Sequence, residues 1–407
     1  MSDSTPNTAV PEDAGLVKKL IFIGLFTRIL VDTGTQLFFP FLPMIAAGLG
    51  VSEVVAGRLV SLRSMTGLAA PLFGAWADRR GYRLVMRFGL AIAAVGFTLI
   101  GLSNNLWLAT LGVLLAGIGG YSFVPNLQAY LSNMLPYNRR ARGIGILEYA
   151  WALAGIVGLF VMGQLIALTS WRAPFFVLGG SLLVAAVLYG YLPGREQSPV
   201  PRAATTDSAG RRLRDFFHLG LRTQSAYFTI AISGLVMFAA MNLFITYGTW
   251  LAREYGLQAG ALGTVALVMG LSDLSGSVSV SLFTDRIGKR RSVYVGAGTA
   301  AFFFAMLPLF NQTLILAIVG LFCARGLFEF TVVANLTLLS EQVAAQRAKV
   351  LTLAAALATV GTAVAGFTGP WLYETGGIAW VGLCSAVALF TASLVARFAV
   401  REPDEDE

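Results

Sequence analysis

The sequence is poor in the side chains that most often build metal sites, disulfides and nucleophilic centres. It contains one histidine, His218, and two cysteines, Cys323 and Cys384, in 407 residues. Both cysteines fall in apolar stretches, where a free thiol behaves as a small apolar side chain. A zinc site or a histidine-based catalytic site needs more partners than these. We therefore expect no disulfide, no metal, no cofactor and no enzymatic activity.

Charge is also scarce, since Asp, Glu, Lys and Arg make up 12% of the chain while 56% is hydrophobic and the mean hydropathy is +0.73. This composition lies outside the range of soluble domains. A helix needs roughly 20 apolar residues to cross the hydrocarbon core, and a backbone in lipid must satisfy its hydrogen bonds internally. The sequence therefore predicts an all-α polytopic membrane protein with twelve transmembrane helices, near 19–42, 53–76, 82–103, 106–131, 143–168, 174–193, 226–250, 259–283, 291–310, 313–338, 347–372 and 377–398.

The net charge of +8 is typical of nucleic-acid binders, but here the basic residues gather in alternate loops. These residues are Lys18 and Lys19, Arg79 to Arg87, Arg139 to Arg142, Arg195 to Arg222, Arg286 to Arg291, Arg347 and Lys349, and Arg397 and Arg401. Loops rich in Lys and Arg face the cytoplasm. We expect both termini and the long middle loop to be cytoplasmic, in a bacterial-type inner membrane, with lipid and no nucleic acid as partner.

The chain divides into two halves. Residues 194–222 are rich in Pro, Ser, Thr and charge, which predicts a cytoplasmic linker between six-helix units at 18–193 and 223–398, with cytoplasmic tails at 1–17 and 399–407. Asp78 and Asp285 stand 207 positions apart (285 − 78), and the same offset relates Arg79 to Arg286, Gly81 to Gly288 and Arg83 to Arg290. This register indicates a duplicated unit, and so two pseudo-symmetric six-helix bundles.

Both repeated phrases, "GAWADRRGYR" and "SLFTDRIGKR", resemble the loop signature G-x-L-x-D-R-x-G-R-R of the major facilitator superfamily. Trp76 replaces the usual Leu, Tyr82 replaces a basic residue, and Ser281 replaces the second glycine. The stretch "GTQLFFPFLP" resembles a pattern of the drug/proton antiporter branch, through Gly34, Pro40 and Pro43. The arginine usual in the fourth span of that branch is replaced by Val113, and the fifth-span motif is reduced to "GIVG". The resemblance implies the superfamily's fold of two six-helix bundles.

The repeated loop is predicted to act as a cytoplasmic gate. Its residues are Gly74, Asp78, Arg79, Gly81 and Arg83, with Asp285, Arg286, Gly288 and Arg290 in the second copy. A carboxylate beside a helix N-terminus is held by about 0.3 to 2 kcal/mol, which suits a reversible latch. The family resemblance implies that Asp78 meets the start of the eleventh span, near Arg347. Arg80 and Arg87 are interpreted as residues that only fix topology.

Ionisable residues inside predicted spans are the candidates for solute and proton binding, because such residues cost about 2.5 to 3.5 kcal/mol or more at mid-bilayer and usually face a wet interior. The proton-coupling candidates are Asp32, Asp273 and Glu329. The candidates for a substrate cavity are Arg28, Gln36, Arg63, Glu148, Trp151, Asn242 and Arg325.

Two intramembrane pairs share a spacing of four, Arg28 with Asp32 and Arg325 with Glu329, which places opposite charges on one helix face. Either pair is also open to a purely stabilising interpretation. Asp273 has no base within one turn, so we expect it to bind a proton or to pair with another span, such as Arg63. Glu148 beside Trp151 is expected to hold an organic cation, with simple packing of the tryptophan as the alternative.

These patterns predict a monomeric secondary active transporter that works by alternating access, with protons and a small molecule as partners. No G-x4-G-K-[ST] loop occurs, so ATP is not expected to drive it. Our first hypothesis is proton-coupled efflux of an amphipathic, drug-like molecule. The alternatives are proton-coupled uptake of a metabolite or organic anion, and a transport-inactive membrane sensor on the same fold.

Overall fold

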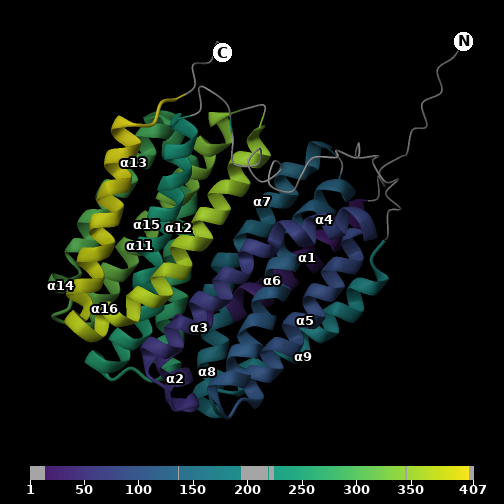
Figure 1. Cartoon of the computed structure of the whole chain (residues 1–407), viewed down its shortest axis with the longest axis horizontal. Helices are drawn as coiled ribbons and strands as arrows, with labels where there is room; N and C mark the ends of the chain where they lie inside the picture. The colour runs from purple at the N-terminus through teal and green to yellow at the C-terminus, as the bar shows by residue number, and fades with distance from the viewer. Residues whose placement is uncertain (1–13, 136, 194–218, 220–223, 344–345, 403–407) are drawn as a thin grey trace, which may run out of the picture.

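The computed structural model describes residues 14–135, 137–193, 219, 224–343 and 346–402, and the regular elements in these ranges are helices (Figure 1). The predicted tails and the linker at 194–222 therefore lie largely outside the described residues, as does His218. The backbone of Asp285 is described, but its side chain is not.

The first half of the chain forms helices that follow the predicted spans closely. They are α1 (Ala14–Gln36), α2 (Leu42–Leu49), α3 (Glu53–Met65), η1 (Thr66–Ala69), α4 (Ala70–Arg80), α5 (Tyr82–Leu102), α6 (Leu106–Met134), α7 (Tyr137–Leu153), η2 (Ala154–Leu159), α8 (Phe160–Leu168), α9 (Ala173–Leu188) and η3 (Tyr189–Tyr191). The η2 segment is a π-helical turn that contains the "GIVG" stretch and joins α7 to α8.

The second half forms longer helices. They are α11 (Gln224–Tyr255), α12 (Ala259–Ile287), α13 (Lys289–Ala305), α14 (Leu307–Phe310), α15 (Leu314–Gln342) and α16 (Arg347–Phe398). The 52 residues of α16 are two helices joined at a break, because Gly376 and Gly377 have non-helical backbone angles. The break falls between the predicted spans 347–372 and 377–398.

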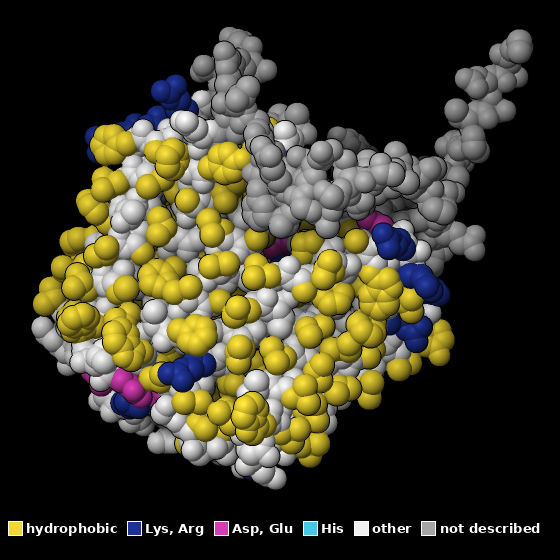
Figure 2. Space-filling view, in the orientation of Figure 1, with side chains coloured by type: hydrophobic (Ala, Val, Ile, Leu, Met, Phe, Trp, Pro, Cys, Tyr) yellow, Lys and Arg dark blue, Asp and Glu magenta, His cyan; other side chains and the backbone are white. Residues whose placement is uncertain are grey.

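Eight helices in the described part of the chain are long and apolar enough to cross a membrane, or nine if α2 and the helix after it, bent by 109°, form one span. The space-filling view shows hydrophobic side chains over most of the visible flank (Figure 2). Both observations support a multi-pass membrane protein. The count of twelve spans stays a prediction.

The two repeated loops have the same backbone geometry. Gly81 and Gly288 have φ values of 91° and 92°, a region that favours glycine, and their amides donate to Ala77 O and Thr284 O. Each glycine ends one helix and begins the next. The two copies related by the offset of 207 thus share one backbone geometry at this turn.

The two halves of the chain lie side by side and touch at the end remote from the described termini, which we call the distal side (Figure 1). A Cβ atom on Gly57 of α3 would lie 2.6 Å from Pro370 Cγ of α16, and one on Gly163 of α8 would lie 2.8 Å from Gly263 Cα of α12. Such approaches need small residues. The glycines of α8 and α12 therefore hold the halves together on this side.

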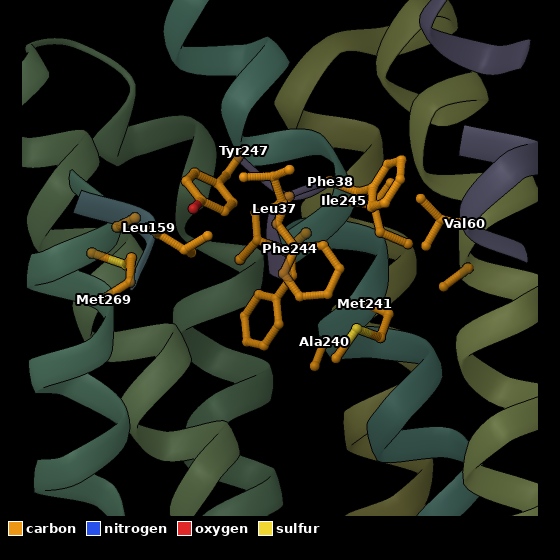
Figure 3. Close-up of a cluster of buried hydrophobic side chains, with 14 of the residues drawn as sticks. Leu37, Phe38, Val60, Leu159, Ala240, Met241, Phe244, Ile245, Tyr247 and Met269 are labelled. Carbon is orange, nitrogen blue, oxygen red and sulfur yellow. The ribbon is translucent and has the colours of Figure 1, made fainter. Parts of the chain in front are cut away.

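Polar groups also cross between the halves on the distal side. Arg253 of α11 forms an ion pair with Glu53 of α3, and Gln164 of α8 donates to Gly260 O of α12 at 3.1 Å. A cluster of buried apolar side chains from both halves lies beside these contacts, with Leu37, Phe38, Leu159 and Phe244 among those labelled in Figure 3. This apolar cluster seals the distal side.

Candidate functional site

Two cavities lie between the halves, and they share Arg28, Trp151, Met237 and Met241 in their walls. Cavity A, of about 360 Å³, is formed mainly by α1, α3, α6, α11 and α16. Cavity B, of about 590 Å³, is formed by α7, α11, α12 and α15. Volumes of this size suit small molecules.

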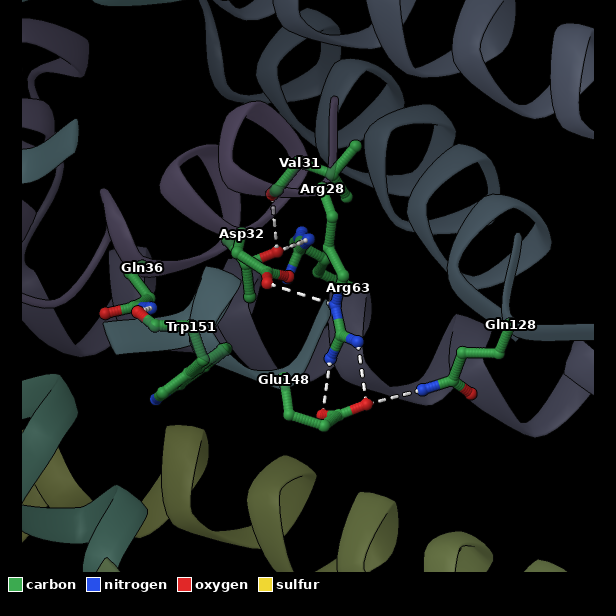
Figure 4. A network of polar contacts seen from close by, with 9 residues as sticks. Arg28, Val31, Asp32, Gln36, Arg63, Gln128, Glu148 and Trp151 are labelled. Atoms are coloured by element: carbon green, nitrogen blue, oxygen red, sulfur yellow. Dashed lines mark hydrogen bonds and ion pairs between the residues drawn. The ribbon is translucent and has the colours of Figure 1, made fainter. Parts of the chain in front are cut away.

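Arg28 is the centre of the charged cluster in the first half. Its guanidinium donates from two nitrogens to the carboxylate of Glu148 on α7, at 2.8 and 2.9 Å, and its Nε lies 3.4 Å from Asp32 Oδ2 (Figure 4). Gln128 donates to the same carboxylate at 2.7 Å. The predicted pair of Arg28 and Asp32 is confirmed, but Arg28 also bridges to a helix 120 positions further along.

In this conformation the carboxylate of Glu148 is paired with Arg28, so its expected contact with an organic cation stays a prediction. Trp151 lines both cavities, and its main-chain oxygen accepts a hydrogen bond from Gln36 Nε2 at 2.8 Å. Gln36 is itself fully buried and lies outside the walls of cavities A and B.

Arg63 of α3 is 5% exposed and lines cavity A. Its Nη2 donates to the hydroxyl of Thr35 on α1 at 2.6 Å. The structure thus places Arg63 beside the Arg28 cluster, whereas Asp273, the carboxylate suggested as its partner, pairs elsewhere.

Asp273 and Arg325 form a fully buried ion pair in the second half. Arg325 Nε and Nη2 on α15 donate to the two carboxylate oxygens of Asp273 on α12, at 2.6 and 2.8 Å. The guanidinium also lies over the ring of Phe244, 4.3 Å from its centroid. The expected pairing of Arg325 with Glu329 is therefore wrong, because the fork of Arg325 matches a carboxylate on the neighbouring helix in a bidentate geometry.

Glu329 faces cavity B and accepts a hydrogen bond from Ser277 at 2.9 Å. Of the carboxylates that line cavity B, Glu148 and Asp273 have basic partners within ion-pair distance. Within the described residues, none is found for Glu329. The cavity therefore holds one buried acid whose charge is not neutralised by a neighbour.

Asn242 lies outside the walls of cavities A and B. Its amide donates to Phe238 O at 2.8 Å, one turn back along α11, and its carbonyl accepts from Thr368 of α16 at 2.7 Å. It joins two helices of the same half. The structure thus shows Asn242 in a hydrogen bond across helices, and its contact with a solute stays a prediction.

The gate residues make contacts within their own halves. Arg83 donates to Leu192 O at 2.7 Å, and its counterpart Arg290 donates to Ala396 O at 3.1 Å, so each arginine caps the carbonyl end of a later helix. Asp78 accepts from Tyr82 at 2.9 Å, and a Cβ on Gly74 would have no neighbour within 4 Å. Within the described part of the chain, no neighbouring helix therefore packs closely on Gly74.

The remaining gate residues Arg79, Arg286 and Gly288 flank these positions in the two loops, and the side chain of Asp285 lies outside the described residues. No ion pair between the two loops is found in the described part of the chain. On the distal side, by contrast, Arg253 and Glu53 form an ion pair between the halves.

Four partners of the charged residues were missed by sequence reasoning, namely Thr35, Gln128, Phe244 and Ser277. Gln128 is a polar residue within a predicted span, and this alone could have marked it as a candidate partner of a buried charge. The two hydroxyls and the ring are common residues in spans, so no local signal marks them.

Comparisons with known proteins agree with this architecture. The sequence model of the Major Facilitator Superfamily matches residues 24–346 and 229–407, which together cover most of the chain. The chain belongs to this superfamily. Its fold and its helical composition follow from that membership.

Individual proteins are also similar to this chain in sequence or in fold. An uncharacterized MFS-type transporter YwfA of Bacillus subtilis is 28% identical over 86% of this chain and 84% of its own length. The multidrug resistance protein MdtG of Proteus mirabilis is 25% identical over 70% of this chain and 72% of its own length. A crystal structure of a D-xylose-proton symporter covers 95% of this chain and 98% of its own, with a TM-score of 0.77 and 17% identity, a likeness of fold.

Proposed function

We propose that the protein is a proton-coupled secondary transporter that exports small amphipathic molecules by alternating access. The observation that carries the proposal is a pair of cavities between two halves, walled by apolar side chains and buried charges, and closed on the distal side. The names of the multidrug resistance relatives favour efflux. We further propose twelve spans in two six-helix bundles, with the termini cytoplasmic in an inner membrane, so that this conformation faces inward.

Glu329 is our first candidate for the proton carrier. Burying a carboxylate without a basic neighbour is costly, and protonation removes that cost. Asp273 is less suited in this conformation because Arg325 compensates its charge with two hydrogen bonds. Asp32 is intermediate, since it shares Arg28 with Glu148.

Reconstituted protein tests the function directly. We expect a pH gradient across proteoliposomes to drive accumulation of an amphipathic dye such as ethidium or of an aromatic carboxylate, and addition of either solute to drive proton movement. The variant Glu329→Gln should lose the solute-driven proton flux. The matched control is Glu341→Gln, which changes a half-exposed carboxylate on the same helix, outside cavities A and B.

Proton flux that survives in Glu329→Gln with unchanged pH dependence would reject Glu329 as the carrier. Wild-type protein that moves neither protons nor any solute would favour the alternative of a membrane sensor. The second candidate function is proton-coupled uptake, which the likeness to a proton symporter of known fold keeps open. Uptake predicts solute accumulation in the direction of proton flow rather than against it.

A further inference from the structure

Buried arginines in this chain differ in how their charge is compensated. Arg28, Arg63 and Arg325 are each less than 10% exposed. Arg28 has two carboxylates within ion-pair distance and Arg325 has one. Arg63 has none among the residues that the structure describes, and its hydrogen bond goes to a neutral hydroxyl on Thr35.

The guanidinium of Arg63 has donors to spare. Its Nε has no hydrogen-bond partner in the described part of the chain, and Nη2 is the nitrogen that Thr35 holds. Five N–H groups are available on an arginine. Gly120 of α6 leaves room beside it, because a Cβ there would lie 3.7 Å from Nη2. Arg63 therefore lines cavity A with a guanidinium for which no ion-pair partner is found among the described residues.

The two cavities differ in the sign of the charge on their walls. Cavity A has Arg28 and Arg63 with a single acid, Asp32, and the charge of Asp32 lies beside Arg28. Cavity B has three acids, Glu148, Asp273 and Glu329, with Arg28 as the basic residue in its wall. An anion is therefore attracted to cavity A and repelled by cavity B.

The remaining wall of cavity A is mainly apolar, with hydroxyl groups such as those of Ser64 and Thr359 among its side chains. Phe38, Phe39, Val60 and Met241 line it, with Trp151 at the boundary with cavity B. A ligand that fits has a flat apolar body and one anionic group. A free inorganic anion would gain nothing from these walls.

We propose that cavity A binds an amphipathic organic anion, whose carboxylate is received by Arg63 and whose apolar body lies against the aromatic wall. The proposal rests on the transport function proposed above and names its substrate class. Thr35 is a positioning residue, since its hydrogen bond to Nη2 fixes the direction of the Arg63 guanidinium. A proton on Glu329 in cavity B and an anion on Arg63 in cavity A then occupy separate places.

The test is equilibrium binding to purified protein in nanodiscs without any gradient, so it does not depend on transport. The probes are naphthalene-2-carboxylate and naphthalene-2-carboxamide, which share a body and differ in charge. A charge-assisted hydrogen bond predicts that wild-type protein binds the carboxylate roughly 10- to 100-fold more tightly than the amide. Arg63→Gln should bring the two probes to within about threefold of each other, since it removes this charge-assisted contact.

Two further variants separate charge, shape and folding. Arg63→Lys should keep part of the preference, because it keeps the charge and loses the fork. Arg58→Gln removes an exposed arginine of the same helix and should leave the preference unchanged. Size-exclusion profiles in detergent show whether each variant folds.

Equal binding of the two probes by wild-type protein, or no binding of the carboxylate, overturns the proposal, and so does a preference that survives in Arg63→Gln. If Arg63→Gln does not fold, the wild-type comparison and Arg63→Lys decide. Proteoliposomes without proton-coupled transport, together with an intact preference for the carboxylate in nanodiscs, would reject the proposed coupling. The proposed anion site would still be supported in that case.

Discussion

The ion pair between Asp273 and Arg325 makes a strong prediction about stability. Both side chains are nearly inaccessible, at 2% and 3% exposure, and two hydrogen bonds of 2.6 and 2.8 Å join them. Asp273→Asn leaves a guanidinium in the interior without a carboxylate. Breaking a buried pair in this way costs about 3 to 5 kcal/mol of the free energy of unfolding.

Removing both charges has a different expected result. In Asp273→Asn combined with Arg325→Met, no charge is left unpaired, and such replacements are often neutral. The contact of Arg325 with Phe244, worth about 2 kcal/mol when desolvated, is also lost, so we expect the double variant to lie within about 2 kcal/mol of wild type. The coupling energy between the two positions should then be at least about 2 kcal/mol.

The assay is unfolding by sodium dodecyl sulfate in mixed micelles, followed for wild type, both single variants and the double variant. Glu374→Gln serves as a control, since it neutralises an exposed carboxylate and should change stability by less than about 0.5 kcal/mol. Costs that add within about 0.5 kcal/mol, or a single variant that loses less than about 1 kcal/mol, would refute the argument that the pair compensates itself.

Two other predictions concern the distal side. Glu53→Gln removes the ion pair with Arg253, which is partly exposed, so we expect a loss of about 0.2 to 1 kcal/mol and up to a fivefold shift toward the distal-open state, measured as distances between spin labels on the distal loops. An unchanged distance distribution would contradict this role. At Gly57 even a Cβ atom would lie 2.6 Å from Pro370 Cγ, so we expect Gly57→Leu to prevent distal closure and to abolish transport, measured as solute uptake into proteoliposomes. The control is Gly180→Leu, which should transport normally because nothing lies within 4 Å of a Cβ at that position. Equal activity of these two variants would count against the close approach.

Much of the fold could be predicted from the sequence. The predicted spans fall mainly in helices, and the break at Gly376 and Gly377 lies at the boundary of the last two. The first predicted span, 19–42, is too long, because α1 ends at Gln36 and a turn follows it before α2. The repeated loops also have matching backbone angles at Gly81 and Gly288. These features depend on local composition and on glycine at fixed places, which a sequence displays directly.

The pairing of buried charges could be predicted only within one helix. Arg28 and Asp32 are one turn apart, so their contact follows from helix geometry. The bonds from Arg28 to Glu148 and from Arg325 to Asp273 join different helices. Spans that are apolar all round carry no marked face, so their rotation about their own axes, and hence these contacts, depends on packing.

The π-helical turn η2 has a consequence for how the continuous helix of α7, η2 and α8 tolerates a deletion. Each residue of an α-helix advances the winding by about 100°, and a π turn accommodates extra backbone within one turn. Deleting one residue between 154 and 159 would leave Gly163 seated against Gly263 while swinging Glu148 away from Arg28. A single deletion in this stretch would thus separate the contact at Gly163 from the ion pair of Glu148 with Arg28, while the helix itself stays continuous.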